Sequence, residues 1–370
     1  MSLASRCADA LLNPFFPGIL LAILLYHRGF IILQNVTPAA SNNIYTMDEL
    51  RTLDTLERIP CTLYSPKEFQ RRYEIPRQPV ILTDCASHWP ANQLWTNAHQ
   101  LIPRFSNTSQ WRSSLHEDDS MHDTVDWETI VQAIQNEQPY YIFDQLQSGE
   151  KTALQKDYTT PAPFQGTDLY QSSFLANISY PPNYGPMRWF CMGSKLSGSL
   201  PHQDPHATDA WNTVVSGHKW WILFPPGMEE EDICPDDDEC AQRLDAIDWY
   251  AQFGKSSSTT SSALHVLQRP GETLYVPFDR VHSVLNMEAS ISVTANFASI
   301  GNLDAILEDF EEEDLPELQY TLYQALLREG THAHLLTPYA ERFLTANPPT
   351  TLMNQGQCRK WERINEESHQ

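Results

Sequence analysis

The sequence predicts a mainly β fold with flanking helices, in which the strands form a double-sheet jelly roll or a barrel. Between residues 187 and 297, short runs rich in β-branched and aromatic residues alternate with Gly and Pro turns, which is typical of a two-sheet jelly roll or barrel. Helical patterns precede and follow this stretch. A hydrophobic content of 41% and ten Trp residues are sufficient for a large core.

The first predicted element is a helix beginning at Thr46, where Thr46 and Glu49 have the spacing of a capping box. Ser65 and Pro66 begin a second helix, which ends before Pro76. The strands are expected at 79–84, 140–143, 187–192, 200–204, 210–215, 219–224, 263–267, 272–276, 281–286 and 291–297. Further helices are expected at 127–136, 241–253, 303–310, 315–328 and 338–344, and 154–174 is expected to form loops with short helices.

The chain divides by composition into five parts. They are a hydrophobic N-terminal segment (1–45), a helix and strand extension (46–145), a barrel domain (146–300) with an insertion at 225–262, C-terminal helices (301–346) and a tail (347–370). The C-terminal helices are expected either to cap the barrel or to pair two copies into a homodimer.

The N-terminal segment contains a twelve-residue apolar run at 15–26. The run is too short for a clean membrane span but has the length of a signal-peptide core. Asp9 and Arg28 argue against a signal, so two alternatives stay open: a secretory signal or anchor, and an amphipathic appendage or wrongly assigned start. Membrane contact is expected only through residues 10–36. The first alternative implies the endoplasmic reticulum, the secretory pathway or a membrane anchor, and the second the cytoplasm or nucleus.

Two further features depend on the compartment. Sequons at Asn35, Asn107 and Asn177 are compatible with secretion but also occur by chance at this rate. The seven cysteines have neither CxxC pairs nor zinc spacing, so a structural zinc site is not indicated. Cys234 and Cys240 flank an acidic loop and would form either a disulfide in an oxidising compartment or two reduced thiols.

The formal charge is −23, from 47 acidic and 24 basic residues. Acidic residues cluster at 229–232, 236–239 and 308–314. Such a surface repels phosphate backbones, which disfavours nucleic acid as a partner, and attracts a Lys- or Arg-rich protein or peptide. Each single run also fits a solvated loop.

Three residues form a candidate metal site. His202 and Asp204 are two apart in a predicted strand, so their side chains are expected on one face. His282, in a later strand, would complete the two-histidine, one-carboxylate set that suits Fe(II) and leaves positions open for a cosubstrate and O2. Lys219 begins a strand that the turn at 216–217 could fold back beside the preceding one. A buried Lys requires an anion, and a dicarboxylate that chelates the iron would provide one.

The segments RWFCMGS, SGSLPHQDPHATDAWNTVVSGHKWWILFP and VHSVLNMEASISVTANFAS resemble the JmjC-domain, 2-oxoglutarate- and Fe(II)-dependent oxygenases, and most closely the arginine demethylase and lysyl-hydroxylase branch. The resemblance spans 64–299 and makes 146–300 the JmjC catalytic domain. It implies a double-stranded β-helix of the cupin-like jelly-roll type. It implies His202, Asp204 and His282 as catalytic iron ligands. It places 2-oxoglutarate against Lys219 and Thr294, with Asn212, Ser199 and Tyr141 as further polar contacts and Asn296 nearby.

Alternation along the strands gives partial independent support for the cosubstrate residues. Thr294 shares a strand face with Ser292 and Asn296, and three polar groups on one face favour a polar cavity. Tyr141 alternates with Phe143 and faces either the interior cavity or a core site where its hydroxyl bonds to backbone. His206 and His218 are interpreted as structural or as neighbours of the ligands.

The resemblance implies oxidation of a C–H bond by Fe(II) and 2-oxoglutarate, and the acidic surface favours side-chain hydroxylation of a lysyl or other basic residue in a protein. The alternatives are an N-methyl arginine or lysine (histone) demethylase, an oxygenase for a small molecule or RNA base, and a non-catalytic cupin-like binding protein. One departure bears on the substrate channel: residues 278–281 read Phe-Asp-Arg-Val where relatives have Gly-Gly-Trp-Trp. Two aromatics are lost there, and an ion pair is expected beside the metal.

Overall fold

The computed structural model describes residues 43–113, 124–169, 187–228, 233, 246–255, 260–312 and 322. Several predicted features lie outside these residues. They are the N-terminal apolar run, the sequons at Asn35 and Asn177, Cys234 and Cys240, most of the acidic runs, the helix at 338–344, nearly all of the helix at 315–328, and the tail.

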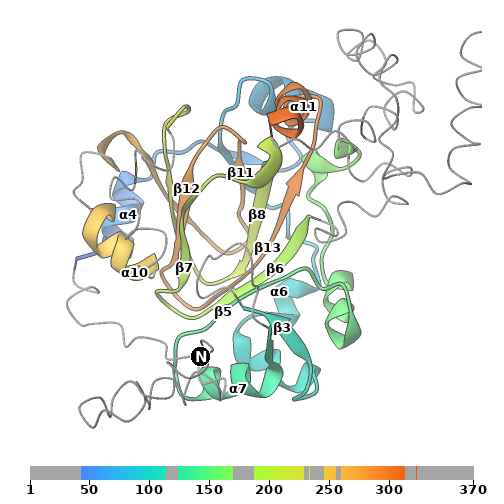
Figure 1. The fold of residues 1–370 in the computed structure, drawn as a ribbon, viewed down its shortest axis with the longest axis vertical. Coiled ribbons are helices and arrows are strands. Elements are labelled where there is room, and N and C mark those ends of the chain that lie inside the picture. The colour runs from blue at the N-terminus through green and yellow to red at the C-terminus, as the bar shows by residue number, and fades with distance from the viewer. Residues whose placement is uncertain are drawn as a thin grey trace, which may run out of the picture. The chain divides into compact units, whose positions relative to one another are not determined.

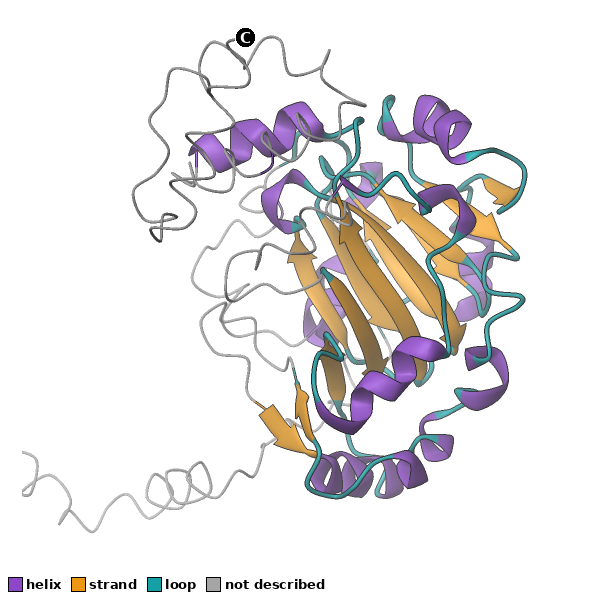
Figure 2. Ribbon diagram, turned by 90° about the vertical axis from the view of Figure 1, so that its right-hand side faces the viewer, coloured by secondary structure: helices purple, strands orange, loops and turns teal. Residues whose placement is uncertain are grey.

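Two β-sheets form the body of the molecule (Figures 1 and 2). The seven-stranded sheet has the order β1 (Arg58–Pro60), β2 (Val80–Thr83), β11 (Thr273–Val276), β8 (Asp209–Ser216), β13 (Ser290–Phe297), β6 (Arg188–Gly193), β5 (Tyr141–Asp144). The four-stranded sheet has the order β10 (Leu264–Gln268), β9 (Lys219–Leu223), β12 (His282–Asn286), β7 (Gly198–His202). A small ribbon joins β3 (Gln110–Arg112) to β4 (Thr124–Asp126). The predicted jelly roll is confirmed.

The helices lie outside the two sheets (Figure 2). They are α4 (Met47–Leu53), α5 (Pro66–Phe69) with a π-helical turn at Gln70–Glu74, α6 (Ala91–Leu94), α7 (Trp127–Gln135), α10 (Ala246–Trp249) with a π-helical turn at Tyr250–Gly254, and α11 (Leu303–Glu312). The capping box of Thr46 and Glu49 is present at the start of α4. Helices α4 and α10 contact strands of the four-stranded sheet, as Figure 1 shows. Within the described residues, none of the helices combines the length and apolar character needed to cross a membrane.

Strand alternation separates an outer core from an inner face. On β13, Ile291, Val293, Ala295 and Phe297 point outward into an aromatic-rich core beneath the N-terminal extension. The interior of the barrel has an apolar part, which includes Trp221, Leu274 and Val284. The alternate residues of β13, beginning with Ser290, therefore face inward and are polar.

The expectation that the strand at 219–224 folds back beside the preceding strand is wrong. β8 belongs to the seven-stranded sheet, whereas β9 pairs with β10 and β12 in the other sheet. Gly217 has a φ of 79°, a conformation that favours glycine, and an added Cβ there would meet the carbonyl oxygen of Ala289 at 2.4 Å. The turn thus carries the chain across the barrel, so that Lys219 and Asn212 approach the interior from opposite sheets.

A disulfide between Cys61 and Cys85 joins the end of β1 to the segment after β2. The sequence did not indicate this pair, because the two cysteines are 24 residues apart and fit no spacing motif. Parallel pairing of β1 with β2 brings them together.

Glu74 provides a test of core electrostatics. It is only 1% exposed, and burial raises its pKa from 4.5 to about 7. The folded chain therefore holds this proton more tightly than the unfolded chain, and stability falls as the pH rises from 4.5 to about 7. Glu74→Gln, which removes the charge, is expected to raise the free energy of unfolding by about 3 kcal/mol near pH 8, and by less than about 1 kcal/mol near pH 5. Urea unfolding at both pH values tests this, with the exposed Glu137→Gln as control. An equal change in the free energy of unfolding at pH 5 and pH 8 would contradict the raised pKa of Glu74.

Candidate metal centre

His202 and His282 are brought opposite each other by the pairing of β7 with β12. Their ring centroids are 4.4 Å apart. The register of the two strands shifts between His282 and Val284, so that Ser199 lies opposite Val284 and His202 opposite His282. This β-bulge inserts one extra residue on β7 and makes Ser199 and His202 face the same side, although simple alternation would separate them.

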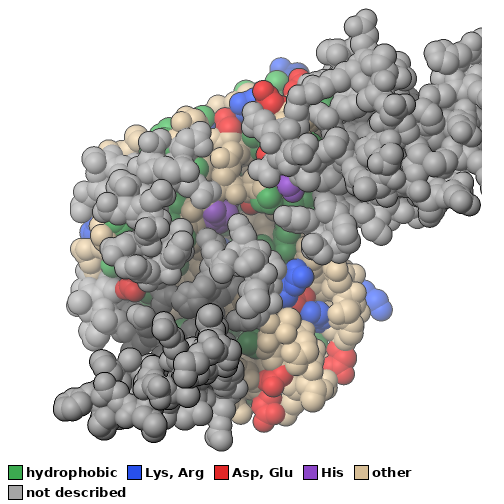
Figure 3. All heavy atoms as spheres, viewed as in Figure 1, with side chains coloured by type: hydrophobic (Ala, Val, Ile, Leu, Met, Phe, Trp, Pro, Cys, Tyr) green, Lys and Arg blue, Asp and Glu red, His purple; other side chains and the backbone are tan. Residues whose placement is uncertain are grey.

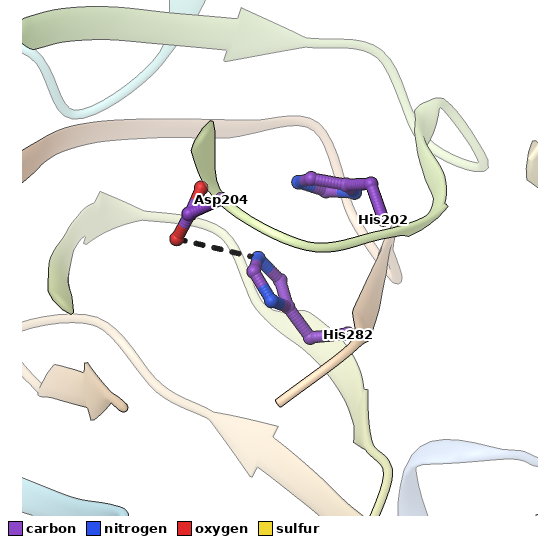
Figure 4. Close-up of side chains that lie close together, drawn as sticks. All are labelled: His202, Asp204 and His282. Atoms are coloured by element: carbon purple, nitrogen blue, oxygen red, sulfur yellow. Dashed lines mark ion pairs between the residues drawn. The ribbon is translucent and has the colours of Figure 1, made fainter. Parts of the chain in front are cut away.

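Asp204 completes the cluster (Figure 4). One nitrogen of each histidine and one carboxylate oxygen all lie within 4.8 Å of one another, and Asp204 Oδ2 is 3.9 Å from His282 Nε2. The three side chains converge on one space, which is the arrangement of a two-histidine, one-carboxylate metal site. Among the described residues, no other group of histidine, cysteine and carboxylate side chains has this geometry.

The expectation that Asp204 shares a strand with His202 is wrong in one detail. β7 ends at His202, and Asp204 precedes the short 3₁₀ turn Pro205–Ala207. Pro205 cannot donate a ladder hydrogen bond, so the strand stops before it. The bend of the chain after His202, and not strand alternation, directs the carboxylate toward the histidines.

Backbone carbonyls fix the orientation of both histidines. His202 Nδ1 lies 2.8 Å from the Leu200 carbonyl oxygen, and His282 Nδ1 lies 3.1 Å from that of Arg280. A carbonyl can only accept, so each Nδ1 carries the proton and each Nε2 keeps a lone pair for a metal. Burial, together with the proximity of His202, lowers the pKa of His282 to about 4. The imidazole is therefore neutral near pH 7, as a metal ligand must be.

The segment before His282 is held in place by several contacts. Gln203 Nε2 donates to the carbonyl of Phe278 at 2.8 Å, and the Phe278 N–H donates to Asp209 Oδ1 at 3.0 Å. An ion pair was expected in this segment, and Asp279 forms one at 3.6 Å with Arg77, a distant residue, rather than with the adjacent Arg280. Arg280 instead donates to the carbonyl of Phe224.

A row of polar side chains leads inward from the three candidate ligands. Asn296 Nδ2 donates to Thr208 Oγ1 at 3.0 Å, near the end of β13 that is closest to Asp204. Thr294 lies opposite Asn212 of β8, and its hydroxyl donates to the Trp211 carbonyl. The buried side-chain oxygen of Asn212 has no hydrogen-bond partner within the described part of the chain. An unsatisfied buried acceptor of this kind fits a site for a polar ligand.

Tyr141 reaches the same interior from β5. It lies opposite Gly193, and the neighbouring Ile142 belongs to the outer core, so alternation directs Tyr141 inward. A Cβ on Gly193 would meet the Tyr141 ring at 2.7 Å. Glycine at this position therefore leaves room for the tyrosine.

Lys219 lies at the far end of this interior. It is 2% exposed, and its Nζ donates to Asn286 Oδ1 at 2.9 Å. No carboxylate of the described residues lies within 4.0 Å of its ammonium group. Burial lowers its pKa to about 8. A buried cation whose hydrogen-bond partner is a neutral amide favours binding of an anion.

Asn286 was not predicted from the sequence. It pairs with Lys219 in register, its Nδ2 donates to Ser197 Oγ at 3.0 Å, and it accepts a hydrogen bond from Ser290. It lies four residues after His282 on the same strand, so alternation already put it on the ligand face. That signal was available, but an Asn at the end of a strand usually indicates a turn.

His206 and His218, the two other histidines considered in the sequence analysis, have acidic partners. His206 Nδ1 lies 3.0 Å from Asp309 Oδ2 on α11, and His218 Nδ1 lies 2.6 Å from Glu288 Oε2. Helix α11 thus contacts the turn that follows Asp204. Histidine side chains are visible at the surface in Figure 3, and His202 and Asp204 are half-buried rather than enclosed.

A double-stranded β-helix with two histidines and a carboxylate at one end defines the class of cupin-type metal-binding proteins. The chain belongs to the cupin-like domain family, whose model matches residues 66–302. It is 31% identical over 265 residues to the bifunctional arginine demethylase and lysyl-hydroxylase psr-1 of Caenorhabditis elegans, covering 68% of this chain and 64% of the relative. The resemblance to that branch of the JmjC oxygenases is confirmed.

Two other relatives also have names of iron-dependent oxygenases or demethylases. The arginine-specific demethylase JMJ22 of Arabidopsis thaliana is 30% identical over 257 residues, 69% of this chain and 48% of the relative. The 2-oxoglutarate and iron-dependent oxygenase JMJD4 of Danio rerio is 24% identical over 275 residues, 68% of this chain and 62% of the relative. The chain thus spans between about half and just under two thirds of the length of these relatives.

Proposed function

We propose that this chain is an Fe(II)- and 2-oxoglutarate-dependent oxygenase that hydroxylates lysyl or other basic side chains of a protein. The observation that carries the proposal is the buried Lys219 ammonium, which has a neutral amide as partner and lies on the same interior face as the two histidines. The names of the relatives support the cofactor and cosubstrate, since they include an iron-dependent oxygenase and a lysyl-hydroxylase.

The spacing along the strands suits a five-carbon dicarboxylate. Lys219 pairs with Asn286, four residues beyond His282 on β12. Four residues of strand correspond to roughly 13 Å. The Lys219 side chain and a bound 2-oxoglutarate would together span this distance. One carboxylate would then contact the ammonium group while the keto-acid end reaches the metal position.

The donor set fits a divalent iron. His202, Asp204 and His282 would hold Fe(II), and the three open positions would admit 2-oxoglutarate and O2. Together they would supply an oxidant able to hydroxylate a C–H bond, with release of succinate and CO2. The chain's own contribution is positioning: Lys219 and Thr294 would bind the far carboxylate, and Asn212, Ser199 and Tyr141 would line the path to the metal.

A basic protein substrate is supported by charge beside the metal site. Helix α11 contacts the turn after Asp204, and it exposes Asp304 and Glu308, one helical turn apart on one face. Carboxylates at this edge would attract a lysine- or arginine-rich segment. Demethylation of an N-methyl arginine or lysine is the second candidate, because the same oxidation on an N-methyl carbon ends in loss of formaldehyde, and two relatives are named as arginine demethylases.

The decisive test is turnover by purified protein with Fe(II), ascorbate, 2-oxoglutarate and a library of lysine- and arginine-rich peptides, with and without N-methyl groups. Succinate formation coupled to a gain of one oxygen on an unmethylated peptide is the expected result. Loss of one methylene mass from methylated peptides alone would favour the demethylase. Iron binding without any consumption of 2-oxoglutarate would overturn the proposal in favour of a binding protein. Consumption of 2-oxoglutarate without a mass change in any peptide would support the cofactor and cosubstrate but contradict the basic protein substrate.

A further inference from the structure

Three features of the structure that the oxygenase chemistry does not use bear on the compartment in which the chain folds. They are the Cys61–Cys85 disulfide, the state of Cys191, and the sequon at Asn107. None of the three involves the candidate metal ligands.

The disulfide is part of the core. Cys61 and Cys85 are each 3% exposed and pack in the outer hydrophobic cluster. Their Cα atoms are 5.0 Å apart, within the range that a disulfide needs. The Cys61 N–H also donates to the Thr83 carbonyl at 2.8 Å. The disulfide therefore links β1, a three-residue edge strand, to the segment that follows the neighbouring strand β2. Structural disulfides of this kind form and persist in oxidising compartments and are rare in the cytosol and nucleus.

Cys191 is the one cysteine of the described residues outside a disulfide. It is 3% exposed on β6, and burial raises its pKa to about 11. A thiol in this state reacts slowly with oxidants and with other thiols. The described part of the chain thus offers no accessible thiol that would form wrong disulfides in an oxidising environment.

The sequon Asn107-Thr108-Ser109 lies in a surface turn between the segment Ile102–Arg104 and β3. The Ser109 N–H donates to the Ser106 carbonyl at 3.0 Å, which puts Asn107 and Thr108 at the centre of the turn. The turn is anchored on both sides: the Ser106 N–H donates to Glu150 Oε2 at 2.6 Å, and the Ser109 carbonyl accepts from the Trp127 N–H at 2.8 Å.

Asn107 itself is exposed, while its backbone carbonyl accepts from the Glu128 N–H. All of these contacts of the turn use backbone groups of residues 106–109, so a sugar on the Asn107 side chain would displace none of them. The turn adjoins β3 and α7, which lie together at the lower end of the view in Figure 1, whereas α11, beside the metal ligands, lies at the upper end. The turn that carries Asn107 and helix α11 therefore lie toward opposite ends of the molecule in this view.

We propose that this chain matures in an oxidising secretory compartment, where Cys61 and Cys85 are joined and Asn107 carries an N-linked glycan. In the first reaction the two thiols lose two protons and two electrons to the disulfide of a thiol oxidoreductase, which is reduced to its dithiol. In the second, the Asn107 amide nitrogen displaces the diphosphate of a lipid-linked oligosaccharide, forms a bond to the sugar and loses a proton. This inference deepens the proposed function, and rests on it only in naming the substrate class: basic proteins that pass through the same compartment.

The test uses the full chain expressed in cultured animal cells, blocked with N-ethylmaleimide at lysis and mapped by mass spectrometry without reduction. The expected result is a linked Cys61–Cys85 peptide, together with conversion of Asn107 to Asp by peptide N-glycosidase in heavy-oxygen water. Ser109→Ala removes the acceptor sequon and should abolish that conversion, whereas Ser109→Thr keeps the sequon and should retain it.

Recovery of Cys61 and Cys85 as maleimide adducts, or of wild-type Asn107 as the unmodified residue, would overturn the proposal. Neither readout depends on enzyme activity. A chain that is oxidised and glycosylated but does not consume 2-oxoglutarate would therefore contradict the proposed function alone, and an active chain with free thiols would contradict only this inference.

Discussion

Asp204→Ala is expected to remove 2-oxoglutarate turnover down to background and to weaken Fe(II) binding by on the order of 100-fold or more, since changes even to groups that only support metal ligands cost 10- to 100-fold. The carboxylate is the anionic member of the set, and its Oδ2 lies 3.9 Å from His282 Nε2. Without it, two neutral imidazoles would have to hold a divalent cation. Succinate formation and Fe(II) titration, followed by the absorbance of the metal complex with 2-oxoglutarate, measure the two effects separately.

The matched control is Asp48→Ala on α4. The Asp48 side chain is 89% exposed, so its loss should change neither quantity. His99→Ala, which removes an exposed histidine, controls for non-specific metal binding. Full turnover in Asp204→Ala, with iron still bound, would mean that the carboxylate is not a ligand and that the candidate metal centre is misassigned.

Most strand positions could be predicted because the strands and turns of a jelly roll are indicated by local sequence patterns. Alternating apolar residues and Gly turns located β8, β11 and β13 to within a residue or two. Strand partners could not be predicted in the same way. Whether β9 pairs with β8 or crosses to the other sheet depends on packing between distant strands, which a local pattern does not contain.

For the candidate site too, residue types could be predicted from local sequence, whereas features that depend on strand pairing could not. The motif of His202, Asp204 and His282 was evident from residue types and from the family resemblance. The side on which Ser199 lies depends on the β-bulge in β7, and one extra residue reverses the result of simple alternation. The disulfide of Cys61 with Cys85 likewise depends on the parallel pairing of β1 with β2. In each case the missing information is the register between strands, which is fixed only in the folded sheet.

Lys219→Met is expected to raise the KM for 2-oxoglutarate by on the order of 100-fold while leaving Fe(II) binding unchanged. A hydrogen bond to a charged group contributes about 1.5 to 3 kcal/mol, and the variant would also leave a buried carboxylate without a partner. Met keeps most of the side-chain volume, so the interior of the barrel should pack as before. Lys195→Met, at an exposed lysine, is the matched control and should have no effect on KM.

The pH dependence of KM separates a charge effect from a packing defect. Burial lowers the pKa of Lys219 from 10.5 to about 8, so the ammonium is charged below this pH and neutral above it. In the wild type, the KM for 2-oxoglutarate should therefore be constant below about pH 8 and rise up to about tenfold per pH unit above it. In Lys219→Met the KM should be high throughout, without this break. A wild-type KM that stays flat to about pH 10, or an unchanged KM in Lys219→Met, would show that the cosubstrate carboxylate is held elsewhere. The buried cation would then need another anion, because the described residues place only the neutral amide of Asn286 against it.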